Sequence, residues 1–320
     1  MNNSRQQASA PNAFSEALLT ESQLYKLEIP PREPVIHGLI INESITVISG
    51  ARGAGKSFLA MEIGNEVTWG GNVGPWRVDG ALNVLYVDGE MQRELYRERL
   101  QGMNLGRNLI RKPGTFYLYS DAHAYHMGLR ATSLLDEEWR DVMLREIDDM
   151  NIGLLILDNL SALAPGIDEN EKLDFDPISQ WLKQVRHHGI AIIVIHHVGK
   201  SGDQRGTSAR EDNVDTSLVL NPPKDYDQST DGCTFEIKAT KDRANIITHM
   251  PAKFTLTGDG IKKRLRLEMD KRSCSVEDVV EAIRSTLPDY MSYKEAVDAG
   301  YSQRTYYRAL EMLKERGEVD

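Results

Sequence analysis

The strongest signal in this 320-residue chain is the glycine-rich loop Gly50-Ala51-Arg52-Gly53-Ala54-Gly55-Lys56-Ser57. It fits the pattern G-x-x-x-x-G-K-[ST], in which glycines let the backbone approach phosphate groups closely. The run Ile45–Ser49 before the loop is mostly apolar and β-branched, as a buried parallel strand is, and Phe58–Val67 after it predicts a helix. Strand, loop and helix in this order aim backbone N–H groups and a helix N-terminus at one point. The sequence therefore predicts a binding site for the polyphosphate of a nucleotide.

The chemistry of such a loop assigns roles to its residues. Lys56 would reach the β- and γ-phosphates, and the Ser57 hydroxyl would ligate Mg²⁺, so we expect ATP and Mg²⁺ as cofactors. The residues expected to bind the nucleotide are Gly50, Ala51, Arg52, Gly53, Ala54, Gly55, Lys56, Ser57 and Phe58.

Apolar strands alternate with helical segments beyond this loop. Strands are expected at residues 83–87, 115–119, 153–157 and 191–195, and helices at 92–102 and 134–150. Such alternation predicts an α/β fold with a mostly parallel, twisted sheet and helices on both faces. Two later runs, at residues 234–239 and 254–256, are expected to add antiparallel strands at the edge of this sheet.

The amino-acid composition limits the classes of protein to which the chain can belong. Hydrophobic residues make up 40% and charged residues 27% of the chain, as in an ordinary globular protein. Cys233 and Cys274 form neither a disulfide framework nor a zinc spacing, so we expect a cytoplasmic protein. No apolar run approaches the ~20 residues of a membrane span, and no membrane partner is expected. A net charge of -10 excludes a uniformly basic surface but not a basic ring or groove that binds nucleic acid.

The chain divides by composition into four parts. Residues 1–29 are expected to form a disordered arm and a linker helix, with the helix over residues 14–27 packing either on its own domain or on a neighbouring subunit. Residues 30–260 form the expected nucleotide-binding domain. A linker at 261–274 leads to a small helical domain at 275–320.

A second nucleotide-site signal is the apolar strand at residues 154–157, which ends in Asp158. This is the Walker B pattern, and Asp158 would hold Mg²⁺ through its water shell together with Ser57. The next residue is Asn159, where many P-loop ATPases carry a catalytic glutamate.

A carboxylate is available instead in the turn Val87-Asp88-Gly89-Glu90-Met91. We expect Glu90 to polarise the attacking water, with Asp88 as the second choice. The alternative is that this acidic turn caps the helix that begins near Gln92.

Two histidines and a basic loop follow the strand at residues 191–195. His196 and His197 are adjacent in a strand, so their side chains point to opposite faces, which disfavours a shared metal. The glycine-rich loop after them carries Lys200, Arg205 and Arg210 and suits contact with a phosphate backbone, although an ordinary solvated loop has the same composition.

A pair of cations ends the predicted strand near residue 239. Lys241 and Arg243 lie two residues apart and are expected to share one face of that strand. The residues alone are equally compatible with two surface charges on an edge strand.

Taken in order, these motifs resemble those of the RecA-like P-loop ATPases of the RepA type, an AAA_25-like group of relatives of the DnaB-class hexameric replicative helicases. The resemblance spans residues 30–258. The motifs that carry it are Pro-Pro-Arg-Glu at residue 30, the P-loop, Val-Asp-Gly-Glu-Met at 87, Leu-Asp-Asn-Leu-Ser-Ala-Leu at 157, Ile-His-His-Val-Gly-Lys at 195, Arg-Gly-Thr-Ser-Ala at 205 and Lys-Asp-Arg at 241.

The resemblance implies roles for several residues. Glu90 stands where RecA-like ATPases carry their catalytic glutamate, and His197 would be the sensor that touches the γ-phosphate, unless the register shifts this role to His196. Arg243 would be an arginine finger supplied to the next subunit, with Lys241 as its companion. The resemblance further implies a homo-hexameric ring with single-stranded DNA in a central channel, contacted by the loop from Lys200 to Arg210. Glu211 and Asp212 directly follow that loop, and their negative charge is unfavourable for the implied contact with DNA.

The C-terminal part resembles a winged helix-turn-helix without its wing. Helices are expected at residues 276–285, 293–299 and 303–316, with Ser302 as the N-cap of the third and Gly317 after it. The residues that would face DNA are Arg304, Thr305, Tyr307 and Arg308. Small helical units of this kind also bind proteins, so duplex DNA and a protein are both candidate partners of this domain.

These observations favour an ATP-driven DNA motor, a hexameric replicative or mobile-element helicase. Two alternatives stay open. One is a RecA-like DNA-binding ATPase that does not unwind DNA, such as a recombination mediator or an accessory or defence factor. The other is a nucleotide-dependent switch that assembles partners.

Overall fold

The computed structural model describes residues 10–130, 133–166, 172–197, 213–223, 233–247, 254–257, 266–269, 276–284, 291–298 and 301–319. It divides into two compact units, Met1–Arg32 and Glu33–Asp320.

The first unit contains two short helices, α1 (Ala10–Ala17) and α2 (Glu21–Lys26), where a single helix over residues 14–27 was expected. The break has a local cause, because Thr20 forms a capping box. The Thr20 hydroxyl accepts a hydrogen bond from the Gln23 N–H at 3.3 Å, and the Thr20 N–H donates to Gln23 Oε1 at 2.8 Å. Such a box starts a new helix and so ends the helical pattern before it.

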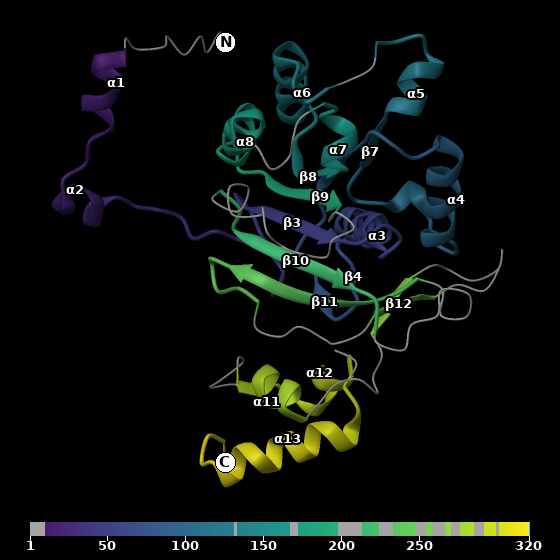
Figure 1. Ribbon diagram of the computed structural model, residues 1–320. Helices are drawn as coiled ribbons and strands as arrows, with labels where there is room; N and C mark the ends of the chain where they lie inside the picture. Colours follow the sequence, from purple (N-terminus) through teal and green to yellow (C-terminus); the bar gives the residue numbers. More distant parts are fainter. Residues whose placement is uncertain are drawn as a thin grey trace. The chain divides into compact units, whose positions relative to one another are not determined.

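The second unit is built on a nine-stranded sheet with the order β13-β12-β11-β10-β3-β9-β8-β6-β7 (Figure 1). Six neighbouring strands are parallel: β10 (Thr216–Asn221), β3 (Ile45–Gly50), β9 (Ala191–His197), β8 (Ile152–Asp158), β6 (Asn83–Asp88) and β7 (Phe116–Ser120). Three strands continue the sheet in antiparallel fashion: β11 (Cys233–Asp242), β12 (Phe254–Thr257) and β13 (Arg266–Met269). The expected α/β class with a mostly parallel sheet is confirmed.

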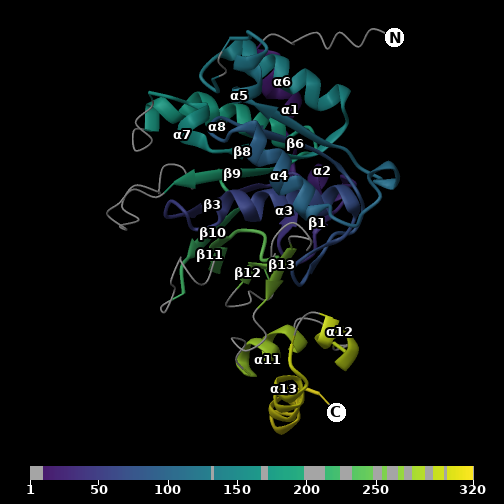
Figure 2. The same cartoon turned by 90° about the vertical axis from the view of Figure 1, so that its right-hand side faces the viewer.

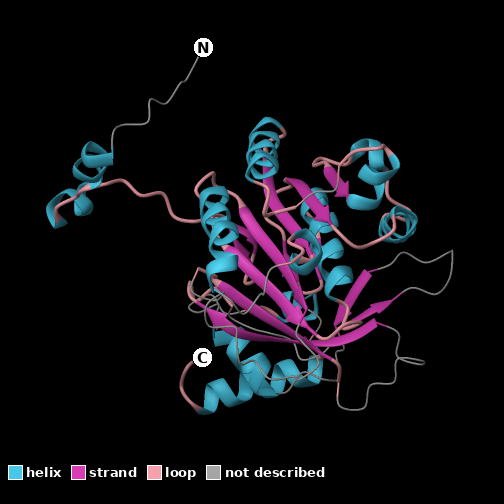
Figure 3. Ribbon diagram, turned by 45° about the horizontal axis from the view of Figure 1, so that its top comes forward, coloured by secondary structure: helices cyan, strands magenta, loops and turns pink. Residues whose placement is uncertain are grey.

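Helices cover both faces of the parallel strands, as Figure 3 shows. One face packs on α3 (Lys56–Trp69) and α4 (Arg93–Met103), and the other on α6 (Glu137–Asp149), α7 (Leu160–Leu163) and α8 (Lys172–Arg186). Side chains alternate between the two faces along β8, so Leu154 and Ile156 belong to the core on the first face and Leu155 and Leu157 to the core on the second.

The shorter elements are α5 (Asp121–His126), the 3₁₀ helix η1 (Leu109–Arg111) and two hairpins, β1 (Pro34–Ile36) with β2 (Ile40–Ile41) and β4 (Asn72–Val73) with β5 (Trp76–Arg77). Among the described helices, none has the length and apolar character needed to cross a membrane.

Two strands of the nine-stranded sheet lie where the sequence analysis placed none. β10 separates the P-loop strand β3 from β11, and β13 falls within residues 261–274, which were expected to be a linker. β13 has only 4 residues, and the alternation of Arg266-Leu267-Glu268-Met269 is a weak signal until a partner strand is present. In the sheet, Leu256 pairs with Leu267 and Thr255 with Glu268. The pairing of residues across neighbouring strands depends on contacts that the sequence of a single strand does not show.

Three helices follow: α11 (Val276–Arg284), α12 (Tyr293–Asp298) and α13 (Gln303–Glu315) (Figure 2). They lie where they were expected and share a small core that includes Val279, Ile283, Ala296, Tyr306 and Leu313. Ser302 caps α13 by accepting the Thr305 N–H at 3.1 Å. The winged helix-turn-helix assignment remains a prediction.

Candidate nucleotide-binding site

The P-loop connects the end of β3 to the start of α3. Gly55 occupies the N-cap of α3 in the left-handed region at φ 90°. A Cβ atom at Gly55 would lie 2.7 Å from Cys233 Sγ and 2.8 Å from the Phe235 ring. Glycine is therefore required there both for its backbone conformation and for space. The turn leaves the first N–H groups of α3 without helical partners and directs them at the loop's concave side.

A cleft of about 740 Å³ opens above this loop, a volume typical of small-molecule sites. Residues 52–58 line one side of it, and Glu90, Asp158 and His197 line another. These side chains follow the carboxyl ends of β6, β8 and β9, which lie on the same edge of the sheet as the end of β3. Ligands of open parallel sheets bind at this edge.

Lys56 is folded back onto its own loop. Its ammonium donates to the carbonyl oxygens of Gly50 at 2.8 Å and Ala51 at 2.7 Å, and its side chain is buried. Burial lowers the pKa of Lys56 to about 8, while the charges of Asp158 and Glu90 act in the opposite direction. A triphosphate placed in the cleft would offer this ammonium charged acceptors in place of neutral carbonyls.

Asp158 ends β8 beside the P-loop and is almost fully buried. The Tyr86 hydroxyl donates to Asp158 Oδ2 at 2.5 Å. Burial raises the pKa of Asp158, and the hydrogen bonds from Tyr86 and Ser57 oppose the rise. A carboxylate and a hydroxyl in contact are the hard oxygen donors that suit Mg²⁺, so this pair fits the expected metal. Sequence reasoning missed Tyr86, although it lies two residues before Asp88 in a strand and so shares its face.

The two acidic residues of the turn after β6 lie in different environments. Asp88 is buried and accepts the N–H groups of Met91 at 2.7 Å and Glu90 at 3.1 Å, so its carboxylate closes the turn. Burial raises the pKa of Asp88 to about 7, and the Met91 hydrogen bond counteracts this. Glu90 instead extends into the cleft with its side chain 68% exposed. This geometry favours Glu90 over Asp88 as the base.

Glu90 reaches the candidate sensor through a residue that sequence reasoning left without a role. Asn159 Nδ2 donates to Glu90 Oε2 at 2.5 Å and lies 3.1 Å from His197 Nε2. The direct distance from His197 Nε2 to Glu90 Oε2 is 3.8 Å. Burial lowers the pKa of His197, as does the charge of Lys56, while Glu90 and Asp158 oppose the shift.

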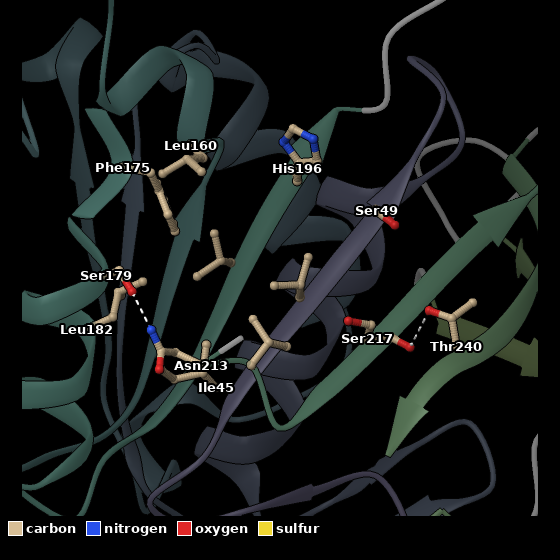
Figure 4. Close-up of a pocket in the computed structure, with 13 residues that line it drawn as sticks. Ile45, Ser49, Leu160, Phe175, Ser179, Leu182, His196, Asn213, Ser217 and Thr240 are labelled. Atoms are coloured by element: carbon tan, nitrogen blue, oxygen red, sulfur yellow. Dashed lines mark hydrogen bonds between the residues drawn. The ribbon is translucent and has the colours of Figure 1, made fainter. Parts of the chain in front are cut away.

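His196 lies on the other face of β9. Figure 4 shows its side chain at a mostly apolar pocket that Leu160 and Phe175 also line. His196 does not line the nucleotide cleft. The two histidines therefore have different surroundings, and the one within reach of the P-loop is His197.

Lys241 and Arg243 do not line this cleft. A bulge pairs Ser217 with Lys241 and Leu218 with Ala239, which interrupts the alternation along β11. Arg243 lies one residue beyond the strand, is exposed, and donates its backbone N–H to Asp215 O at 2.8 Å. The bulge at Thr240 precedes both residues and Arg243 lies outside the strand, so the expected common face of the pair stays a prediction. A role toward a neighbouring subunit stays a prediction.

The residues expected to contact DNA differ in their location and in their contacts within the protein. Lys200, Arg205 and Arg210 lie outside the described residues. Arg304 and Arg308 lie on α13, and Tyr307, half exposed, stacks on Tyr293 with ring centroids 5.6 Å apart. The Thr305 hydroxyl forms a 2.7 Å hydrogen bond with Ser302 Oγ at the helix cap, so it is engaged within the protein.

Comparison with known proteins places the chain among P-loop proteins. The family described as an AAA domain matches residues 10–203. The DNA repair protein RadA of Streptococcus pneumoniae (strain ATCC BAA-255 / R6) is 23% identical over 217 residues, covering 66% of this chain and 43% of RadA. RadA of Bacillus subtilis (strain 168) is 22% identical over 217 residues, covering 66% of this chain and 40% of RadA. The chain thus spans less than half the length of these curated relatives.

Among solved structures, a crystal structure of the RadB recombinase aligns with 72% of this chain and 92% of its own, at 17% identity and a TM-score of 0.47.

Proposed function

The chain belongs to the AAA domain family, and from this premise we propose that it binds ATP with Mg²⁺ and hydrolyses it. The observation that carries the proposal is the convergence of Lys56, Asp158, Glu90 and His197 on one cleft above the P-loop. Phosphoryl transfer to water needs cations against the phosphates, a held metal and an oriented water, and this cleft has a candidate for each.

The roles follow from the contacts. Lys56 leaves the carbonyls of Gly50 and Ala51 for the β- and γ-phosphates, which the P-loop N–H groups also hold. Ser57 and Asp158 would hold Mg²⁺, and the hydrogen bond from Tyr86 orients the Asp158 carboxylate. When bound, the metal neutralises charge on the β- and γ-phosphates. Glu90 orients the attacking water and accepts its proton.

We propose DNA as the second ligand. The resemblance to RepA-type ATPases and the RadA relatives, which are named as DNA repair proteins, both support it. The finer form of the proposal is a homo-hexameric helicase with single-stranded DNA in its channel. The alternative, a DNA-binding ATPase that does not unwind DNA, agrees equally well with the RadA relatives, whose name states only a role in DNA repair. Ring formation together with displacement of a DNA strand would distinguish the helicase from the ATPase that does not unwind DNA. The C-terminal helices would bind duplex DNA or a protein partner.

Single-stranded DNA is expected to stimulate ATP hydrolysis by the purified chain at low salt. Basic contacts to a phosphate backbone release counterions, so the stimulation should disappear between about 50 and 200 mM salt. The measurement is the steady-state rate of phosphate release with and without DNA at each salt concentration. Hydrolysis that is insensitive to DNA at low salt would overturn the DNA proposal and leave the nucleotide-dependent assembly switch.

Lys56→Ala is expected to weaken ATP binding by about 100-fold, because hydrogen bonds to charged groups contribute ~1.5–3 kcal/mol. Calorimetric titration with ATP and Mg²⁺ measures the change. Lys112→Ala is the matched control, since Lys112 is a second lysine whose pKa burial lowers to about 8. Its ammonium contacts Asn65 Oδ1 at 3.3 Å, and it does not line the cleft. Equal affinities of Lys56→Ala and the unaltered chain would contradict the nucleotide assignment.

A further inference from the structure

Asn159 joins the two side chains on which the proposed reaction depends. It directly follows the Walker B strand, it is buried, and its amide nitrogen lies 2.5 Å from Glu90 Oε2 and 3.1 Å from His197 Nε2. These three side chains lie at the carboxyl ends of three different strands, β6, β8 and β9. One amide nitrogen therefore connects the candidate base to the candidate sensor.

The orientation of this amide is set by the backbone. Asn159 Oδ1 accepts the Ala162 N–H at 3.0 Å and caps α7. A flipped amide would place its NH₂ group against that N–H donor, so the oxygen must face Ala162 and the nitrogen must face Glu90 and His197. The two amide hydrogens then have one acceptor each.

This arrangement selects one tautomer of His197. Since Asn159 Nδ2 is a donor, His197 Nε2 must accept, and the proton of a neutral imidazole then resides on Nδ1. His197 Nδ1 is buried and has no hydrogen-bond partner among the residues that the structure describes. In this tautomer Nδ1 is a buried donor with no partner among those residues.

We propose that Asn159 is a positioning residue that holds Glu90 and His197 together and fixes the His197 tautomer. The amide that caps α7 thus fixes the position of the candidate base relative to the candidate sensor. The inference rests on the proposed function in one respect: the linkage bears on turnover because Glu90 and His197 act on ATP.

The first test does not use hydrolysis. In the nucleotide-free full chain with ¹⁵N-labelled histidine rings, His197 is expected to show the shifts of a protonated Nδ1 and an unprotonated Nε2, assigned by comparison with His197→Gln. Asn159→Ser keeps an N-cap acceptor for α7 but is too short to reach both partners. In this variant the His197 signals should move toward the other tautomer or an average of the two. Unchanged signals would overturn the inference whether or not the chain hydrolyses ATP.

The second test separates positioning from folding. Asn159→Ser is expected to lower kcat by about tenfold while the KM for ATP changes by less than about twofold. Asn159→Asp also keeps the cap but places a second carboxylate beside Glu90, so kcat should fall further. In a Glu90→Gln background, Asn159→Ser should cause no additional loss, because residues acting as one unit are not additive.

A structural control comes from the start of β6. Asn83 also bridges two segments, since Nδ2 donates to Met150 O at 2.8 Å and Oδ1 accepts the Thr115 N–H at 2.9 Å. It lies at the opposite end of its strand from the cleft, so Asn83→Ser should affect stability rather than kcat. If Asn159→Ser and Asn83→Ser had the same kcat, the positioning role would be wrong. If the unaltered chain hydrolysed no ATP, the proposed function would fail while the tautomer test still decided the inference.

Discussion

Glu90→Gln is expected to bind ATP as tightly as the unaltered chain and to hydrolyse it about 10²- to 10⁴-fold more slowly. The glutamine keeps the shape of the side chain and an oxygen for the Asn159 amide, but it cannot accept a proton from water. Binding should persist because the P-loop and Lys56 hold the phosphates independently of Glu90. Calorimetric titration with ATP and single-turnover hydrolysis measure the two quantities separately.

Glu94→Gln is the matched control for this variant. Glu94 lies four residues further on, is exposed, and pairs with Arg93 at 3.0 Å outside the cleft. Its turnover should equal that of the unaltered chain. Rapid hydrolysis by Glu90→Gln together with its loss in Asp88→Asn would transfer the role of base to Asp88, the buried carboxylate of the same turn.

Arg243→Ala is expected to lower turnover by at least about 10³-fold with little change in ATP affinity, as the loss of an arginine finger does. The structure provides the reason to test it between subunits, since Arg243 is exposed and does not line the cleft of its own chain. Lys238→Ala removes another exposed cation of β11 and should leave turnover unchanged. Full activity of Arg243→Ala would show that the finger assignment is wrong.

Mixing the two inactive variants tests whether Arg243 acts in trans. In a randomly mixed ring, about a quarter of the interfaces combine an intact Glu90 from an Arg243→Ala subunit with an intact Arg243 from a Glu90→Gln subunit. Phosphate release should therefore recover toward about a quarter of the unaltered rate. If both residues served the same subunit, every mixed site would lack one of them, and mixing would restore nothing.

Local patterns account for what could be predicted. β3, the P-loop and α3 are contiguous, and their signals are apolar runs and glycines that act within a few residues. The same holds for β6, β8, β9 and the three C-terminal helices. β10 and β13 were missed because their local signals are weak, three apolar residues in β10 and alternating charged and apolar residues in β13, and only pairing with other strands completes them. The N-terminal helix was predicted as one segment because apolar spacing outweighed the capping box at Thr20.

The residues of the loop from Gly50 to Ser57 specify a phosphate site in any fold that flanks them with a strand and a helix, because the loop's conformation and its N–H groups are properties of adjacent residues. The arrangement around that loop is a property of packing. Asp88 turns inward to close its turn while Glu90 enters the cleft, and Tyr86 supports Asp158 across 72 positions of sequence. Asn159 meets Glu90 and His197 across 69 and 38 positions, respectively. Such contacts exist because parallel strands bring their carboxyl ends to one edge of the sheet, and their register emerges from the packed cores on both faces.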